Sequence, residues 1–156
     1  MPRKGKVKKR SKAPDQFYNS TLVSQLINGV MIDGKKSIAA RIVYESLEKV
    51  KKTTKEDPLK TYEKAINNIK PLLETKSRRV GGATYQVPVE VDEKRAISLA
   101  IRWLLSHSKQ RPGKSFVDKL SGEIMEAADN KGGAIKKRED THRMAKANRA
   151  FAHYKW

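Results

Sequence analysis

Gly113-Lys114-Ser115 are the residue types with which a phosphate-binding loop ends, and such a loop would hold a nucleotide for phosphoryl chemistry. That loop also needs a glycine five residues before its second glycine, and a strand in front of it. Position 108 is a serine, and the residues before it repeat with helical periodicity. We therefore interpret Ser115 as the cap of a helix, with Asp118 three residues later resembling a capping box.

Acid–base or metal chemistry would need histidines and carboxylates at suitable spacing. His107, His142 and His153 do not have the spacing of metal ligands. Glu139 and Asp140 precede His142, but they lie among four basic residues, which favours a solvated, salt-bridged helix. The chain has no cysteine, which excludes disulfides, thiolate catalysis and cysteine-type zinc sites. We expect no catalytic residue, no metal, no cofactor and no enzymatic activity.

Electrostatic binding chemistry is far better represented. Thirty-five Lys and Arg against 17 Asp and Glu give a net charge of +18, which is typical of a protein with a polyanionic partner. The charge is unevenly distributed, since residues 1–12 contribute +7 and residues 131–156 contribute +6. Smaller basic groups lie at residues 35–36, 76–79 and 109–114. Separated basic groups of this kind favour a folded RNA that meets the protein at many points.

Aromatic residues lie among these cations. Tyr85, Phe151, Tyr154 and Trp156 could stack on bases, a contact worth about 1–3 kcal/mol each, or they could simply pack against other side chains. Trp103 is interpreted as a residue at the rim of the core rather than a stacking platform.

The elements that must position these groups are mostly helical. Apolar periodicity predicts helices over residues 19–31, 35–53, 57–70, 93–108, 115–128 and 134–149. Asp57-Pro58, Asp92 and Ser115 are expected to cap three of them. Glu45 with Lys49 and Glu48 with Lys52 are expected to form ion pairs four residues apart.

Between the third and fourth helices the pattern becomes that of a β-hairpin. Residues 84–91 alternate, residues 73–80 supply a partner strand, and Gly81-Gly82 can adopt the positive φ of a tight turn. The fold class is therefore mainly α, a six-helix single domain with one protruding β-hairpin arm and a basic, flexible N-terminal arm. The expected divisions are 1–18 for the basic N-terminal arm, 19–150 for the helical RNA-binding domain with its hairpin at about 72–91, and 151–156 for an aromatic, basic tail.

Four stretches resemble bacterial small-subunit ribosomal protein seven, in the order that the family has them. They are Met1-Pro2-Arg3-Lys4-Gly5, Met31-Ile32-Asp33-Gly34-Lys35-Lys36, the run from Ser77 to Val91, and the run from Gly132 to Asp140 continuing from Ala147 to Trp156. The resemblance implies six helices with a protruding hairpin. It implies a structural constituent of the small ribosomal subunit that binds the 3′ domain of its rRNA and nucleates assembly of the head. It also implies a cytoplasmic location on the ribosome.

The resemblance further implies the partners of particular segments. The hairpin arm and the C-terminus would lie near exit-site tRNA and the mRNA path, and ribosomal proteins nine and eleven would be neighbours. No membrane association and no stable homo-oligomer are expected. The residues expected to bind rRNA are Arg3, Lys4, Lys6, Lys8, Lys9, Arg10, Lys12, Lys35, Lys36, Lys76, Arg78, Arg79, Arg95, Lys109, Arg111, Lys114, Lys136 and Lys137. Those expected near tRNA or mRNA are Arg78, Arg79, Gly81, Gly82, Thr84, Tyr85, Arg143, Arg149, Tyr154 and Trp156.

Three other classes of protein remain as alternatives. An architectural DNA-binding protein also combines a helical body with basic β-arms. An RNA-processing enzyme would need nucleophile, base or metal ligands within mutual reach. A membrane-surface protein would need a basic amphipathic helix with exposed aromatics. Residues 51–60 match no motif, and no function is assigned to them.

Overall fold

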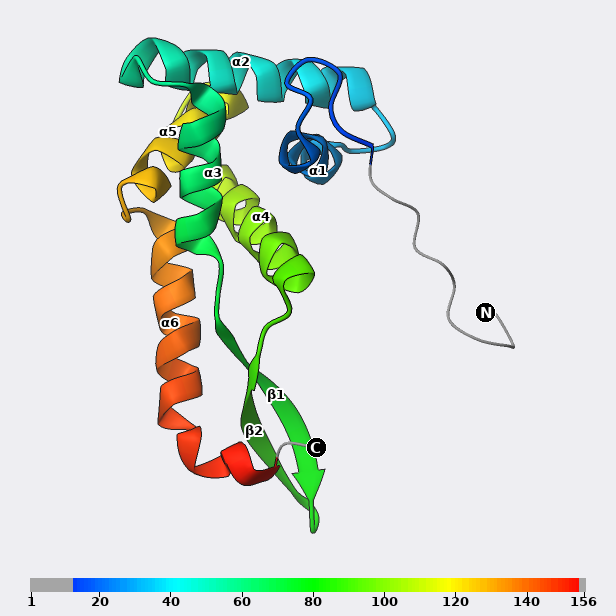
Figure 1. Cartoon of the computed structure of the whole chain (residues 1–156), viewed down its shortest axis with the longest axis vertical. Helices are drawn as coiled ribbons and strands as arrows, with labels where there is room; N and C mark the ends of the chain where they lie inside the picture. Colours follow the sequence, from blue (N-terminus) through cyan, green and yellow to red (C-terminus); the bar gives the residue numbers. More distant parts are fainter. Residues whose placement is uncertain (1–12, 155–156) are drawn as a thin grey trace, which may run out of the picture.

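The computed structural model describes residues 13–154, which form a helical body with a hairpin arm at one end (Figure 1). The helices of the body are α1 (Thr21–Val30), α2 (Lys36–Thr54), α3 (Pro58–Ile69), α4 (Glu93–Gln110) and α5 (Phe116–Ala128). The chain continues through α6 (Gly133–Ala147) into a short 3-10 helix, η1 (Arg149–Tyr154). This arrangement confirms the predicted mainly α class with a single hairpin among the described residues.

The arm consists of β1 (Leu73–Val80) and β2 (Ala83–Glu90), paired antiparallel with Val80 opposite Ala83. Gly81 and Gly82 form the turn with φ values of +57° and +90°. Positive φ at both central residues is the geometry that lets a two-residue turn follow the twist of the strands, and glycine adopts it without steric cost. The predicted hairpin is therefore confirmed, with β2 beginning one residue earlier than expected.

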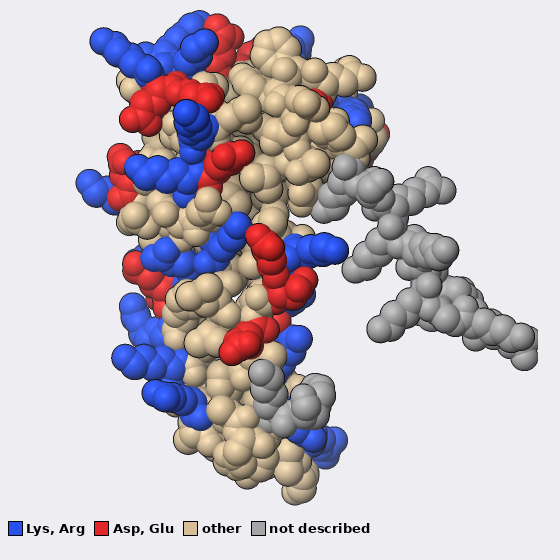
Figure 2. Space-filling model, viewed as in Figure 1, with Lys and Arg blue, Asp and Glu red and all other residues tan. Residues whose placement is uncertain are grey.

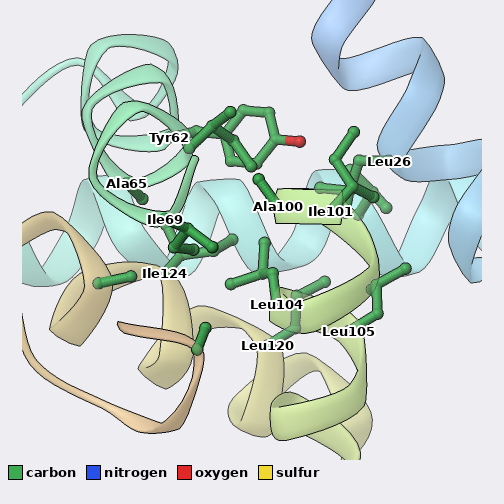
Figure 3. Close-up of a cluster of buried hydrophobic side chains, with 14 of the residues drawn as sticks. Leu26, Tyr62, Ala65, Ile69, Ala100, Ile101, Leu104, Leu105, Leu120 and Ile124 are labelled. Atoms are coloured by element: carbon green, nitrogen blue, oxygen red, sulfur yellow. The ribbon is translucent and has the colours of Figure 1, made fainter. Parts of the chain in front are cut away.

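The core lies where α1 to α5 meet, with the first turn of α6 added to it, and Figure 3 shows part of this cluster. Tyr62 of α3 is fully buried there, beside Leu104 of α4 and Ile124 of α5. Burial of such side chains stabilises the body by roughly 1.5–3 kcal/mol each before the cost of ordering them. Trp103 packs half-buried against this core, as the sequence predicted.

Two of the predicted helix caps are confirmed by hydrogen bonds. The Asp57 side chain accepts from the backbone N–H of Leu59 at 3.0 Å, and Ser115 Oγ accepts from the N–H of Asp118 at 3.2 Å. Asp92 precedes α4 as expected, but its side chain makes no capping hydrogen bond.

One predicted ion pair is wrong. Lys49 does not pair with Glu45 four residues earlier; its Nζ lies 2.6 Å from the carboxylate of Asp118 on α5. The packing of α2 against α5 brings Lys49 to this carboxylate, and the hydrogen bond that Lys49 donates lowers the pKa of Asp118. The pair between Glu48 and Lys52 is confirmed at 2.8 Å.

Residues just before α1 are folded against the body rather than extending from it. The Asp15 carboxylate accepts hydrogen bonds from the backbone N–H groups of Phe17 and Tyr18 and from the hydroxyl of Tyr44 on α2. Tyr18 packs against the core. Part of the stretch assigned to the N-terminal arm therefore belongs to the folded body.

Candidate nucleic-acid interface

One exposed side of α4 carries three basic residues at intervals of seven positions. Arg95, Arg102 and Lys109 are all exposed, and a spacing of two helical turns places them on one side of the helix. Sequence reasoning identified Arg95 and Lys109 but missed Arg102. The seven-residue spacing was the signal that could have found it.

A shallow groove of about 590 Å³ runs along this side of α4, where it meets the last turn of α1. The groove carries two cations, two hydroxyl groups and an apolar floor. Its lining residues are Gly29, Ser98, Ile101, Arg102, Leu105, Ser106, Lys109 and Gln110. Guanidinium, ammonium and hydroxyl donors of this kind can bind the phosphate and sugar groups of a nucleic-acid backbone.

Gly29 sets how closely α1 approaches α4 at the groove. A Cβ at position 29 would lie 2.8 Å from Leu105 Cδ1 and 3.4 Å from Ile101 Cγ2. A side chain at this position would therefore require Leu105 to move at the floor of the groove.

The base of the hairpin arm is tied to α4 by an ionic cluster. Glu74 of β1 is 8% exposed, and its carboxylate lies 2.8 Å from the guanidinium of Arg95 and 3.6 Å from Lys76 Nζ. The hydrogen bond that Arg95 donates to Glu74 raises the pKa of Arg95. Both predicted rRNA-binding cations thus share a carboxylate, but half of each side chain is exposed and open to an additional phosphate contact.

The loop after α4 separates two of the expected RNA contacts. Lys114 is exposed, whereas the guanidinium of Arg111 lies against α5. Arg111 donates to Glu126 and, at 2.8 Å, to Glu123, which is 1% exposed. Glu123 also accepts from the backbone N–H of Ala134 in the first turn of α6. The hydrogen bond with Arg111 lowers the pKa of Glu126.

α6 presents an exposed basic side. Lys136, Lys137 and Arg143 are exposed, and Figure 2 shows Lys and Arg side chains gathered along the edge of the molecule that α6 forms. Arg138 instead turns inward and donates to the backbone oxygen of Asn68 at the end of α3. The basic residues of α6 therefore differ in role, since Lys136, Lys137 and Arg143 face solvent and Arg138 holds the helix to the body.

The acid–base cluster considered on α6 is not brought together for chemistry. Asp140 lies 3.7 Å from Arg143, and Glu139 lies 3.6 Å from Arg138. His142 Nε2 accepts a hydrogen bond from the backbone N–H of Leu72 at 2.9 Å. Burial, together with the charge of Arg138, lowers the pKa of His142. These contacts are those of a structural helix.

The tip of the arm combines exposed backbone with a packed aromatic cluster. Gly81, Gly82 and Thr84 are exposed, as is Arg79. Tyr85 is half-buried because its ring contacts residues of η1. Arg78 donates to a backbone oxygen there. The tip can therefore approach a nucleic acid, but Tyr85, Phe151 and Tyr154, three of the expected stacking residues, contact one another.

The remaining expected contacts lie elsewhere. Lys35 and Lys36 are exposed where α2 begins, and Arg149 is exposed where η1 begins. The expected contacts at Arg3, Lys4, Lys6, Lys8, Lys9, Arg10, Lys12 and Trp156 lie outside the described residues.

Within residues 13–154, no group of three or more histidine, aspartate or glutamate side chains could hold a metal ion. No helix in that range is both long and apolar enough to span a membrane. A helical body with separated exposed basic groups, a basic groove and a projecting β-arm defines the chain as a nucleic-acid-binding protein.

Comparison with known proteins makes the class specific. Residues 2–149 match the family described as Ribosomal protein S7p/S5e, and the chain belongs to that family. It is 58% identical over 156 residues to small ribosomal subunit protein uS7 of Thermoanaerobacter pseudethanolicus, and 55% identical to that of Oleidesulfovibrio alaskensis, covering 100% of both chains in each case. The uS7 protein of Caldicellulosiruptor saccharolyticus is 58% identical over 157 residues. The family is structural and not enzymatic, which confirms the expectation that the chain is no enzyme.

Proposed function

We propose that this chain is a structural constituent of the small ribosomal subunit, that it binds the 3′ domain of the subunit's rRNA directly, and that it nucleates assembly of the head. The observation that carries the proposal is full-length similarity to relatives named small ribosomal subunit protein uS7. The net charge of +18 supplies the electrostatic attraction that a primary RNA binder needs. The ribosome in the cytoplasm is the corresponding location.

The rRNA contacts are proposed at exposed cations around the groove and the base of the arm. Arg102 joins the set because it lines the groove between Arg95 and Lys109. Arg111 is left out because an RNA phosphate would compete there with two carboxylates already in place. Arg78 is left out because its guanidinium already donates to the backbone oxygen of Tyr154. The proposed set among the described residues is Lys35, Lys36, Lys76, Arg79, Arg95, Arg102, Lys109, Lys114, Lys136 and Lys137.

The hairpin tip and the C-terminal segment are proposed to lie near exit-site tRNA and the mRNA path, with ribosomal proteins nine and eleven as neighbours. The exposed glycine turn supports this proposal, because a thin tip without side chains can approach a nucleic-acid backbone closely. The protein acts as one copy, since its partner surface is RNA and other ribosomal proteins.

Binding to a fragment of the small-subunit rRNA 3′ domain across a salt series tests the proposal, with duplex DNA and an unrelated structured RNA as competitors. We expect tight binding that neither competitor displaces. The logarithm of the binding constant should fall linearly with the logarithm of the salt concentration. Equal affinity for all three nucleic acids would overturn the proposal and favour an architectural DNA-binding protein.

A further inference from the structure

The hydrogen bonds within the hairpin arm do not fix its orientation relative to the helical body. β1 and β2 form a two-stranded sheet, and their ladder hydrogen bonds run only between those two strands. An isolated two-stranded hairpin is only marginally stable in water. Contacts from outside the hairpin must therefore set the angle at which the arm leaves the body.

The C-terminal segment supplies such contacts at the base. His142 accepts from the N–H of Leu72 immediately before β1, and Thr75 Oγ1 donates to Met144 Sδ at 3.4 Å. The segment is itself fixed to the body at the start of α6, where Glu123 accepts from the Ala134 N–H. Figure 1 shows α6 running from the body alongside the arm, with η1 turning back toward the strands.

A second set of contacts lies close to the tip. The ring centroid of Tyr85 lies 5.1 Å from that of Phe151 and 5.2 Å from that of Tyr154. Arg78, directly opposite Tyr85 in the strand pairing, donates to the backbone oxygen of Tyr154. Ring centroids at such separations give an attraction beyond that of the buried area alone.

We propose that Tyr85, Phe151 and Tyr154 form an aromatic latch that fixes the direction of the hairpin arm by holding its outer half against η1. The three are positioning residues, because they do not bind a partner themselves but fix the direction of the arm that carries the exposed Gly81-Gly82 turn. The latch already restricts the orientation of the arm in the free protein. A partner that binds the tip therefore loses less binding free energy to ordering the arm. The latch belongs to the free protein and is independent of which nucleic acid the arm meets.

The absence of cysteine from the sequence gives a clean test by spin labelling. One spin label is attached at each of two introduced cysteines, Ala83→Cys at the tip and Asn67→Cys on the exposed side of α3. Double electron–electron resonance spectroscopy then gives the distribution of distances between the two labels. The parent is compared with the latch variant Phe151→Ala/Tyr154→Ala and with the conservative variant Phe151→Tyr/Tyr154→Phe. Phe17→Ala is the matched control, because Phe17 also contacts two tyrosine rings but lies before α1.

We expect a narrow distribution for the parent, the conservative variant and Phe17→Ala, and a broad one for the latch variant. Amide hydrogen exchange should be about tenfold faster in β1 and β2 of the latch variant, with exchange at core residues such as Ile124 unchanged. A distribution as narrow in the latch variant as in the parent would overturn the proposal. So would broadening in Phe17→Ala or uniformly faster exchange in the core, since either would show a general loss of stability.

Discussion

The guanidinium of Arg111 donates to the carboxylate of Glu123 at 2.8 Å, and only 1% of that Glu123 side chain is exposed. The same carboxylate accepts from the first turn of α6, so this single ion pair joins the loop after α4 to α5 and α6. A negative charge at a helix N-terminus is favourable, and the Arg111 charge compensates for its burial. A cation that the sequence associated with RNA is thus held in an ion pair within the fold.

Replacing Arg111 with alanine should lower the free energy of unfolding by about 3 kcal/mol, because it leaves a buried carboxylate without its charge partner. Lys114→Ala, in the same loop but exposed, should change stability by no more than about 0.5 kcal/mol. Urea unfolding monitored by circular dichroism measures both. An unchanged unfolding midpoint for Arg111→Ala would mean that the ion pair contributes nothing net.

The basic groove along α4 leads to a prediction about RNA. Arg102→Ala/Lys109→Ala should weaken binding to the rRNA fragment and reduce the slope of log affinity against log salt by about 0.7–0.9 for each phosphate that the protein no longer neutralises. Stability should be little affected, since both side chains are exposed. Filter binding across a salt series measures the slope.

The matched control for the groove removes two cations that do not line it. Lys51 and Lys60 are exposed and are the two ends of the stretch to which no function is assigned. Lys51→Ala/Lys60→Ala removes the same net charge and should leave most of the affinity and slope intact. Equal losses in both double variants would show that net charge, rather than the groove, determines affinity.

Local features of the fold followed from the sequence because their causes lie close together in the chain. Helical periodicity, the Asp57-Pro58 start and the Gly81-Gly82 turn each depend on neighbouring residues, and each is present in the structure. The expectation for Lys49 failed because a competing carboxylate, Asp118, is 69 positions away in sequence. Local pairing rules do not include such partners.

In the candidate interface, too, local features could be predicted from the sequence and contacts between distant segments could not. Exposed cations on α4 and α6 could be expected from composition and spacing, because a helix places residues seven apart on one side. The aromatic cluster could not, since Tyr85 meets Phe151 only after α6 has returned along the arm. Packing between distant segments therefore decides which aromatic residues contact one another in the structure and which are left for nucleic acid.

The hydrogen bond from Tyr44 to Asp15 makes a prediction about the start of the folded body. Burial raises the pKa of Asp15, but hydrogen bonds from the Tyr44 hydroxyl and from backbone N–H groups outweigh it and lower the pKa overall. Burial and the same hydrogen bond raise the pKa of Tyr44 to about 12. Tyr44→Phe should cost about 1.5–3 kcal/mol at neutral pH, the usual net contribution of a hydrogen bond to a charged group.

The dependence of that cost on pH gives the check. A phenol whose pKa is higher in the folded state stabilises the fold fully below the unfolded value of about 10, and this contribution is lost as pH rises toward the folded value. Urea unfolding of both proteins should therefore show a constant difference from neutral pH to about 10, and a shrinking one above. A difference that grows with pH above that point would refute this interpretation of the bond.

The last prediction concerns His142, whose Nε2 must be unprotonated to accept from the Leu72 N–H. Burial and the charge of Arg138 lower the pKa of His142 below its ordinary value of 6.5. The unfolded chain therefore binds the proton more readily than the folded one. The stabilising contribution is complete above about pH 6.5 and is lost as the pH falls through the folded-state pKa.

His142→Gln provides the comparison, because glutamine offers an acceptor oxygen and does not titrate. The difference in free energy of unfolding between the parent and His142→Gln should be constant above about pH 6.5. At lower pH the parent should lose stability relative to the variant. Taking the difference cancels groups that titrate alike in both proteins. The carboxylates with lowered pKa values, such as Glu126, release their contribution only at more acidic pH. Parallel stability curves from neutral to mildly acidic pH would show that proton binding at His142 is not linked to folding.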